Sequence, residues 1–151
     1  MTEPLGSAGP IKIVLVDDDD EFRFLVRHTL VTGIRELIVV DAADGEAGWA
    51  VVRHEQPDIV ITDLVMPRLD GIGLTRRIKA EFPHTSIILM SSFTEDAYRM
   101  MASDSGADAF LSKQVIYSAL VPAILDVMSR RFRAGRGPIP PDGTSAASCA
   151  Q

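Results

Sequence analysis

Hydrophobic residues form short continuous runs along the chain, and longer amphipathic segments separate these runs. The runs occupy 11–16, 36–42, 58–62, 86–91 and 109–111. They are rich in isoleucine and valine and mostly lack an alternation of polar and apolar positions, which is typical of strands buried on both faces of a sheet. We therefore predict five buried strands.

The segments between the runs show the spacing of helices. Over 20–32, Phe22, Leu25, Val26 and Leu30 fall on a single helical face. The same spacing, less cleanly, predicts helices over 44–54, 71–82 and 94–104. Strand alternating with helix five times predicts an α/β protein with a doubly wound parallel sheet and helices on both faces.

Two turns at helix starts need separate predictions. The last helix contains Pro122, which would break an interior turn, so we predict that it begins near Ser118 as the N-cap. Asp70-Gly71 is predicted to form the turn into the helix over 71–82, with the glycine supplying a backbone conformation that other residues resist.

The length of 151 residues predicts one domain, which we place at 11–130 between a flexible leader (1–10) and a flexible tail (131–151) without an output domain. The leader does not look like a secretory signal, and no apolar run is long enough to cross a membrane. The only cysteine, Cys149, excludes an intrachain disulfide and a cysteine-rich metal site. We therefore predict a cytoplasmic protein.

The net charge of −6 is uneven, because four arginines lie between 130 and 136. The rest of the chain is acidic, which disfavours direct binding of nucleic acid. We interpret the arginines as the solvated end of the last helix, favoured there by the helix dipole.

Polar side chains follow four of the predicted strands: Asp17 and Asp18, Asp63, Ser91, and Lys113. In a parallel sheet they would converge on one edge, where ligands bind in this class of fold. Three carboxylates repel one another, and one lysine leaves about two negative charges that a divalent cation would balance. Carboxylate oxygens without histidine or cysteine favour Mg²⁺ or Mn²⁺.

Four segments in this order, LVDDDDEFR, TDLVMPRLDG, ILMSS and LSK, resemble the bacterial two-component response regulator receiver (CheY-like) domain family. The resemblance covers residues 11–129. It implies a flavodoxin-like (βα)5 fold with strand order 2-1-3-4-5, and a signalling phosphoacceptor that is not an enzyme.

The resemblance also assigns roles at the site. Asp63 would accept a phosphoryl group from a sensor histidine kinase or a phosphotransfer protein. Asp18, Asp63 and the backbone carbonyl of Val65 would ligate Mg²⁺, and Asp17 would reach it through water. Lys113 would pair with Asp63 and then with a phosphoryl oxygen.

Further residues would detect the phosphoryl group. The hydroxyl of Ser91 and the backbone N–H of Ser92 would donate to it. As Ser91 moves inward, Phe110 would follow, and the surface of the helix at 94–104, the strand at 109–111 and the last helix would change. That surface would bind a downstream protein or a second copy of the chain.

The chain departs from many relatives at two points. Gln114 follows Lys113 where proline is common, which predicts a trans peptide bond. Val65 and Phe93 cannot orient an attacking water, so we predict a long-lived aspartyl phosphate. Two other readings stay open: a Mg²⁺-dependent phosphohydrolase with Asp63 as nucleophile, and a docking module that is never phosphorylated.

Overall fold

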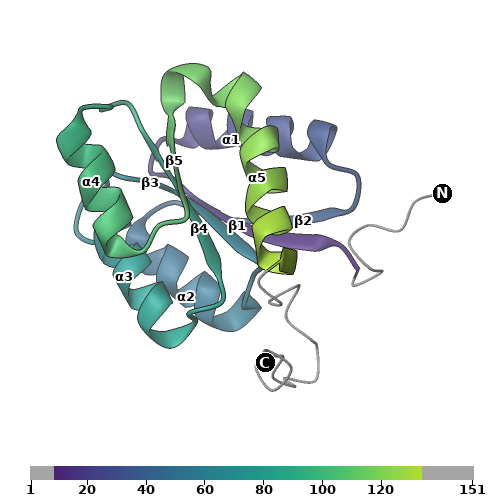
Figure 1. The fold of residues 1–151 in the computed structure, drawn as a ribbon, viewed down its shortest axis with the longest axis horizontal. Coiled ribbons are helices and arrows are strands. Elements are labelled where there is room, and N and C mark those ends of the chain that lie inside the picture. The colour runs from purple at the N-terminus through teal and green to yellow at the C-terminus, as the bar shows by residue number, and fades with distance from the viewer. Residues whose placement is uncertain (1–8, 134–151) are drawn as a thin grey trace.

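Residues 9–133 are described by the structure, a computed structural model. Within them, five parallel strands form one sheet in the order β2-β1-β3-β4-β5 (Figure 1). The strands are β1 (Ile11–Val16), β2 (Leu37–Ala42), β3 (Ile59–Asp63), β4 (Ser86–Ser91) and β5 (Ala109–Ser112). The helices are α1 (Asp20–Gly33), α2 (Gly45–Glu55), α3 (Gly71–Glu81), α4 (Asp96–Ser105) and α5 (Ile116–Arg133). The predicted doubly wound α/β fold and its strand order are confirmed.

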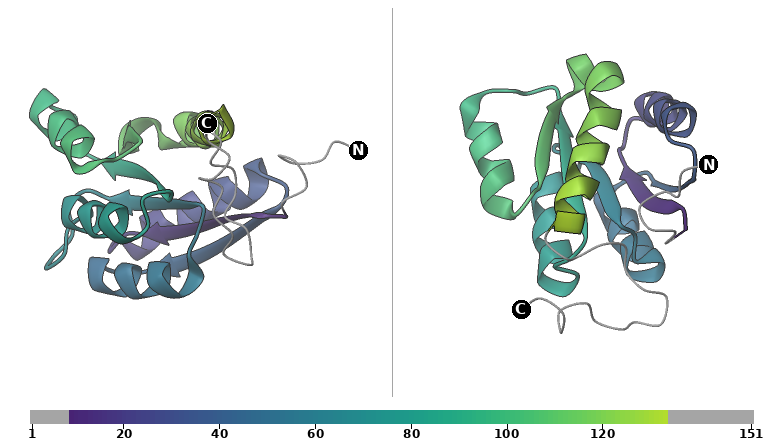
Figure 2. Two further views of the ribbon diagram at one scale, coloured as in Figure 1. Left: turned by 60° about the horizontal axis from the view of Figure 1, so that its bottom comes forward. Right: turned by 45° about the vertical axis from the view of Figure 1, so that its right-hand side comes forward.

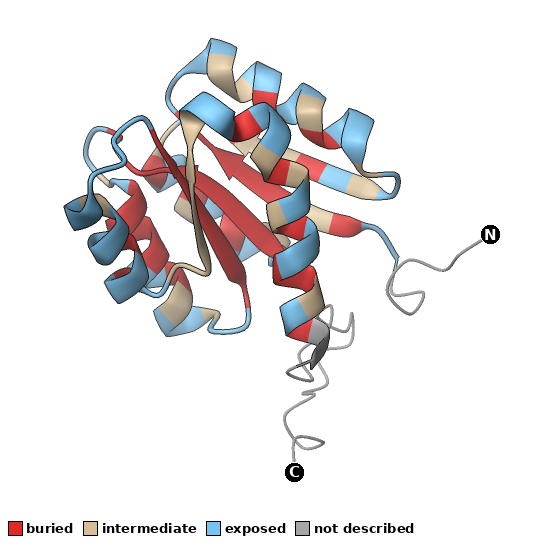
Figure 3. Ribbon diagram, turned by 45° about the horizontal axis from the view of Figure 1, so that its top comes forward, coloured by how far each residue is buried: buried red, intermediate tan, exposed pale blue. Residues whose placement is uncertain are grey.

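The sheet separates two hydrophobic cores. Alternate residues of β1 face opposite sides: Ile13 and Leu15 pack with α1 and α5, whereas Val14 and Val16 pack with the other helices. Figure 2 (left) shows the sheet with α2 and α3 on one side and α5 on the other. Every residue of β3 and β4 is buried, but β5, at the edge, is only half-buried (Figure 3). Burial on both faces explains the continuous apolar runs.

The predicted start of the last helix is wrong. A single 3₁₀ turn, Lys113–Val115, leads directly into α5, so Ser118 lies inside the helix and its hydroxyl donates to the carbonyl of Val115 at 3.2 Å. Ile116 is fully buried in the core, and its burial favours a helix that begins two residues before Ser118. Pro122 is tolerated inside α5, on its exposed side.

The interpretation of the arginines as a solvated helix end is wrong for Arg131. The helix continues to Arg133, past the boundary predicted at residue 130, and Arg131 is only 1% exposed. Its guanidinium donates to the carbonyls of Asp58 and His84 and to the hydroxyl of Ser86. Arg131 therefore anchors α5 to the amino-terminal edge of the sheet. Most of the predicted leader and tail lies outside the described residues.

Within residues 9–133, no helix combines the length and apolar character that a membrane span requires.

Candidate functional site

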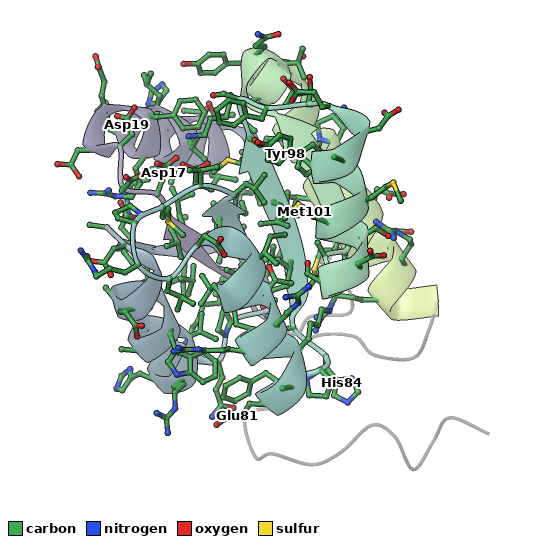
Figure 4. All side chains as sticks on the ribbon, turned by 90° about the vertical axis from the view of Figure 1, so that its left-hand side faces the viewer. Asp17, Asp19, Glu81, His84, Tyr98 and Met101 are labelled. Atoms are coloured by element: carbon green, nitrogen blue, oxygen red, sulfur yellow. The ribbon has the colours of Figure 1, made fainter. Side chains whose placement is uncertain are left out.

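The carboxyl ends of the strands bring the predicted site residues to one edge of the sheet. Asp17 directly follows β1, and Asp63 and Ser91 are the last residues of β3 and β4. Figure 4 shows Asp17 at one end of the molecule and His84 at the other. One carboxylate oxygen from each of Asp17, Asp18 and Asp63 lies within 4.8 Å of the others. The three carboxylates therefore form one cluster.

Lys113 joins two of these carboxylates. Its Nζ lies 2.9 Å from Asp17 Oδ2 and 3.3 Å from Asp63 Oδ2. The side chain of Asp17 is fully buried and that of Asp63 is 11% exposed, whereas Asp18 is exposed. The ammonium group offsets one negative charge, so with all three aspartates ionised the cluster keeps a net negative charge.

Burial raises the pKa of the Asp63 carboxyl to about 6, from an ordinary 3.8. The negative charge of Asp17 adds to this rise, while the ammonium of Lys113 and the N–H of Val65 oppose it. Burial by itself lowers the pKa of Lys113, but its hydrogen bond to Asp17 and the charges of both aspartates raise that pKa above the ordinary value of 10.5. The cluster therefore carries excess negative charge, and a bound cation would reduce the repulsion between its carboxylates.

The run of four aspartates that begins at Asp17 divides between the site and the helix start. Asp19 is the N-cap of α1, and its side chain accepts from the backbone N–H groups of Glu21 and Phe22 at 3.1 Å. Asp17 Oδ1 accepts from the N–H of Asp19 at 2.9 Å. These bonds fix the loop that carries Asp17 and Asp18. The other oxygen of Asp17, Oδ2, accepts from Lys113.

Gly71 is required for a different reason from the one predicted. Its φ angle is not positive, so no special conformation demands glycine. A Cβ at this position would instead lie 2.2 Å from the backbone carbonyl oxygen of Asp63. Asp70 caps α3 by accepting from the N–H of Gly73 at 2.8 Å. The absent side chain therefore lets α3 begin directly against the residue at the centre of the cluster.

Three other predicted residues lie on β4, on β5 or directly after β4. Ser91 is 1% exposed, and its Oγ accepts from the N–H of Phe93 at 2.8 Å, which leaves the hydroxyl proton available to another acceptor. Ser92 follows β4 and is exposed. Phe110 of β5 is half-buried, with the guanidinium of Arg99 over its ring at 5.0 Å. The peptide bond between Lys113 and Gln114 is trans.

Two side chains contact members of the cluster in a way that the sequence did not predict. Arg23 donates to the backbone carbonyl of Asp17 at 2.6 Å and pairs with Asp20 and Asp41. A positive charge in the first turn of a helix is disfavoured by the helix dipole, and this is the signal that could have singled it out. The ring of Phe22, which the pattern assigns to packing alone, lies under the ammonium of Lys113 at 4.3 Å.

Comparison with known proteins identifies the class to which this fold and site belong. Residues 13–125 match the family described as the response regulator receiver domain. The chain belongs to this family, whose members are signalling modules of two-component systems.

Relatives and solved structures agree with the family. The chain is 36% identical over 123 residues to the transcriptional activator protein ExaE of Pseudomonas putida, covering 82% of this chain and 55% of the relative. It is 29% identical to the transcriptional regulatory protein DegU of Brevibacillus brevis, over 76% of this chain and 48% of that protein. The chain thus spans about half the length of these curated relatives.

Among solved structures, the signal receiver domain of the response regulator NarL from Mycobacterium tuberculosis superimposes with a TM-score of 0.73 at 28% identity. The match covers 78% of this chain and 95% of that one. A receiver domain from Clostridium thermocellum gives a TM-score of 0.75 at 26% identity, covering 82% and 98%.

Proposed function

We propose that Asp63 accepts a phosphoryl group from a phosphohistidine of a sensor histidine kinase or a phosphotransfer protein. A carboxylate oxygen of Asp63 attacks phosphorus, the bond between phosphorus and the imidazole nitrogen breaks, and the nitrogen leaves with the electron pair. The observation that carries this proposal is the placement of Asp63 beside Asp17, Asp18 and Lys113 in a chain that belongs to the receiver family.

The residues present fit a bound Mg²⁺ or Mn²⁺. Three carboxylates supply hard oxygen ligands within 4.8 Å of one another, and Asp18 is exposed, which gives a cation access. Asp18, Asp63 and the carbonyl of Val65 would hold the ion, with Asp17 reaching it through water. When bound, the ion would neutralise the charge that builds up as the carboxylate and the phosphoryl oxygens approach.

The remaining residues orient the phosphoryl group. Lys113 already contacts Asp63, so its ammonium would act as a charged donor to an oxygen of a phosphoryl group on that carboxylate. The hydroxyl of Ser91 and the backbone N–H of Ser92 provide further donors. Phosphoryl transfer asks a protein mainly for positioning and electrostatic stabilisation, which these groups supply.

Phosphorylation would be read out on the surface formed by α4, β5 and α5. Ser91 would move toward the phosphoryl group and Phe110 would follow. This surface exposes Met100, Met101 and Tyr117 by 64%, 47% and 58%, apolar side chains suited to contact a downstream protein or a second copy of the chain. A few kcal/mol of new contacts at Asp63 is enough to shift such a two-state element.

The test of this proposal is incubation with Mg²⁺ and acetyl phosphate, followed by mass measurement of the intact protein. We expect one stable phosphoryl adduct on the wild type and none on Asp63→Ala. Continuous turnover of the donor would identify a phosphohydrolase, and no adduct at all would identify a docking module. Label on Asp63→Ala would refute the assignment of the acceptor.

We further expect the aspartyl phosphate to be long-lived. Val65 and Phe93 are 51% and 47% exposed, and the ring of Phe93 stacks on Tyr98 of α4 at 5.4 Å. Neither side chain can orient a water for attack on phosphorus. Val65→Asn and Phe93→Glu should each speed loss of the phosphoryl group by roughly tenfold, measured by decay of the adduct after donor removal. Unchanged decay in both variants would show that the side chains at 65 and 93 do not control the lifetime of the aspartyl phosphate.

A further inference from the structure

The ammonium group of Lys113 contacts three groups in the structure, two carboxylates and one aromatic ring. It donates to Asp17 at 2.9 Å, pairs with Asp63 at 3.3 Å, and lies over the ring of Phe22 at 4.3 Å from the ring centroid. A lysine ammonium has three donors and no acceptor, and its attraction to an aromatic face acts within about 6 Å. Two carboxylates and one ring therefore surround the charge.

The ring of Phe22 is itself held in place. Its backbone N–H donates to the N-cap Asp19 at the start of α1, and its side chain packs against the core between α1, α5 and the sheet. The position of the ring is thus set by α1, which packs against β1, β2 and α5. It offers Lys113 a fixed support that comes from outside its own segment of chain.

Lys113 needs such a support, because its own segment provides little. It follows β5, the half-buried edge strand, and begins a single 3₁₀ turn with only Ser112 as cap. Its long side chain would otherwise keep considerable rotational freedom. The Lys113 side chain is nevertheless only 14% exposed, because the aspartates and the ring enclose it.

We propose that Phe22 is a positioning residue for phosphoryl transfer: its ring face holds the ammonium of Lys113 beside Asp63. This inference rests on the proposed function. During transfer, one N–H of Lys113 exchanges its acceptor: it stops donating to Asp63 and donates to an oxygen of the incoming phosphoryl group. The ammonium keeps its contacts with Asp17 and with the ring of Phe22 during this exchange. It therefore stays out of water and close to Asp63.

Fluorinated phenylalanines at position 22 test the proposal, because each fluorine weakens the electrostatic attraction of the ring while nearly preserving its shape. We expect the rate of Asp63 phosphorylation by acetyl phosphate, at saturating Mg²⁺, to fall stepwise from one to three fluorines, by about tenfold in total. Phe22→Tyr should stay near the wild type, and Phe22→Leu should match the trifluorinated protein. Phe24, on the same helix and 67% exposed, supplies the control Phe24→Leu, which should leave the rate unchanged.

A spectroscopic measurement separates positioning from packing and does not depend on phosphorylation. In the wild type, the ring current of Phe22 should shift the terminal methylene protons of Lys113 upfield in the NMR spectrum, and Phe22→Leu should abolish that shift. Beryllofluoride, as a phosphoryl mimic, should preserve the shift in the wild type.

Two results would overturn the inference while leaving the proposed function intact. The first is a phosphorylation rate independent of fluorination, and the second is an equal loss in Phe22→Tyr and Phe22→Leu. Either would show that Phe22 only fills space. Failure of the wild type to label at Asp63 would instead remove the proposed function, and the Lys113 proton shifts would then report the contact alone.

Discussion

Replacing Arg131 with alanine is expected to lower the free energy of unfolding by about 3 kcal/mol, measured by urea denaturation. The guanidinium is 1% exposed and donates to the carbonyl of Asp58 at 3.2 Å, to the carbonyl of His84 and to the hydroxyl of Ser86 at 3.4 Å. Its Nη2 also lies 3.8 Å from the carboxylate of Asp58. Truncation would leave these buried acceptors without their donor, in addition to a cavity.

Arg130, the preceding residue, provides the matched control. Its side chain is 44% exposed and pairs with Asp126 one helical turn away, so Arg130→Ala should cost no more than about 1 kcal/mol. Arg131→Met refills the space without supplying donors and should keep most of the loss. Equal stability of Arg130→Ala and Arg131→Ala would show that the buried contacts of Arg131 contribute nothing.

The sequence predicts those parts of the fold that depend on local pattern. The isoleucine and valine runs mark strands because both faces of the sheet are covered, and the five strands begin and end within one residue of the predicted limits. The convergence of Asp17, Asp63 and Lys113 follows from the parallel arrangement alone, since the carboxyl ends of parallel strands share one edge.

The features that the sequence hides depend on contacts between distant segments. In the sequence, Arg131 looks like part of a solvated helix end. In the structure, its guanidinium donates to the carbonyl of Asp58, 73 residues earlier in the chain. Gly71 is needed because of a close approach to the Asp63 carbonyl, which no local pattern reveals. An apolar residue at position 22 is already expected from the helical spacing of α1. The sequence therefore gives no sign that the ring of Phe22 also contacts Lys113. Local pattern therefore finds charged site residues more readily than the groups that support them.

Substituting Asp63 by asparagine is expected to stabilise the cation-free protein by about 2–3 kcal/mol at pH 7.5. The pKa of the Asp63 carboxyl is about 6 in the folded protein, against 3.8 ordinarily, and each pKa unit corresponds to about 1.4 kcal/mol. The folded state binds the proton more tightly than the unfolded state does, so ionisation of Asp63 opposes folding. The amide has nearly the same shape and carries no charge that would have to be buried near Asp17.

The pH dependence gives this prediction its sign and its test. The penalty is absent below about pH 4, grows as the pH rises toward 6 and is constant above that, so wild type and Asp63→Asn should converge in urea denaturation at pH 4. Asp104→Asn, at an exposed position of α4, should track the wild type throughout. Mg²⁺ at about 100 times its dissociation constant should restore about 2.7 kcal/mol to the wild type and much less to Asp63→Asn. If the difference in free energy of unfolding between the two proteins stays the same from pH 4 to 7.5, ionisation of Asp63 is not what destabilises the wild type.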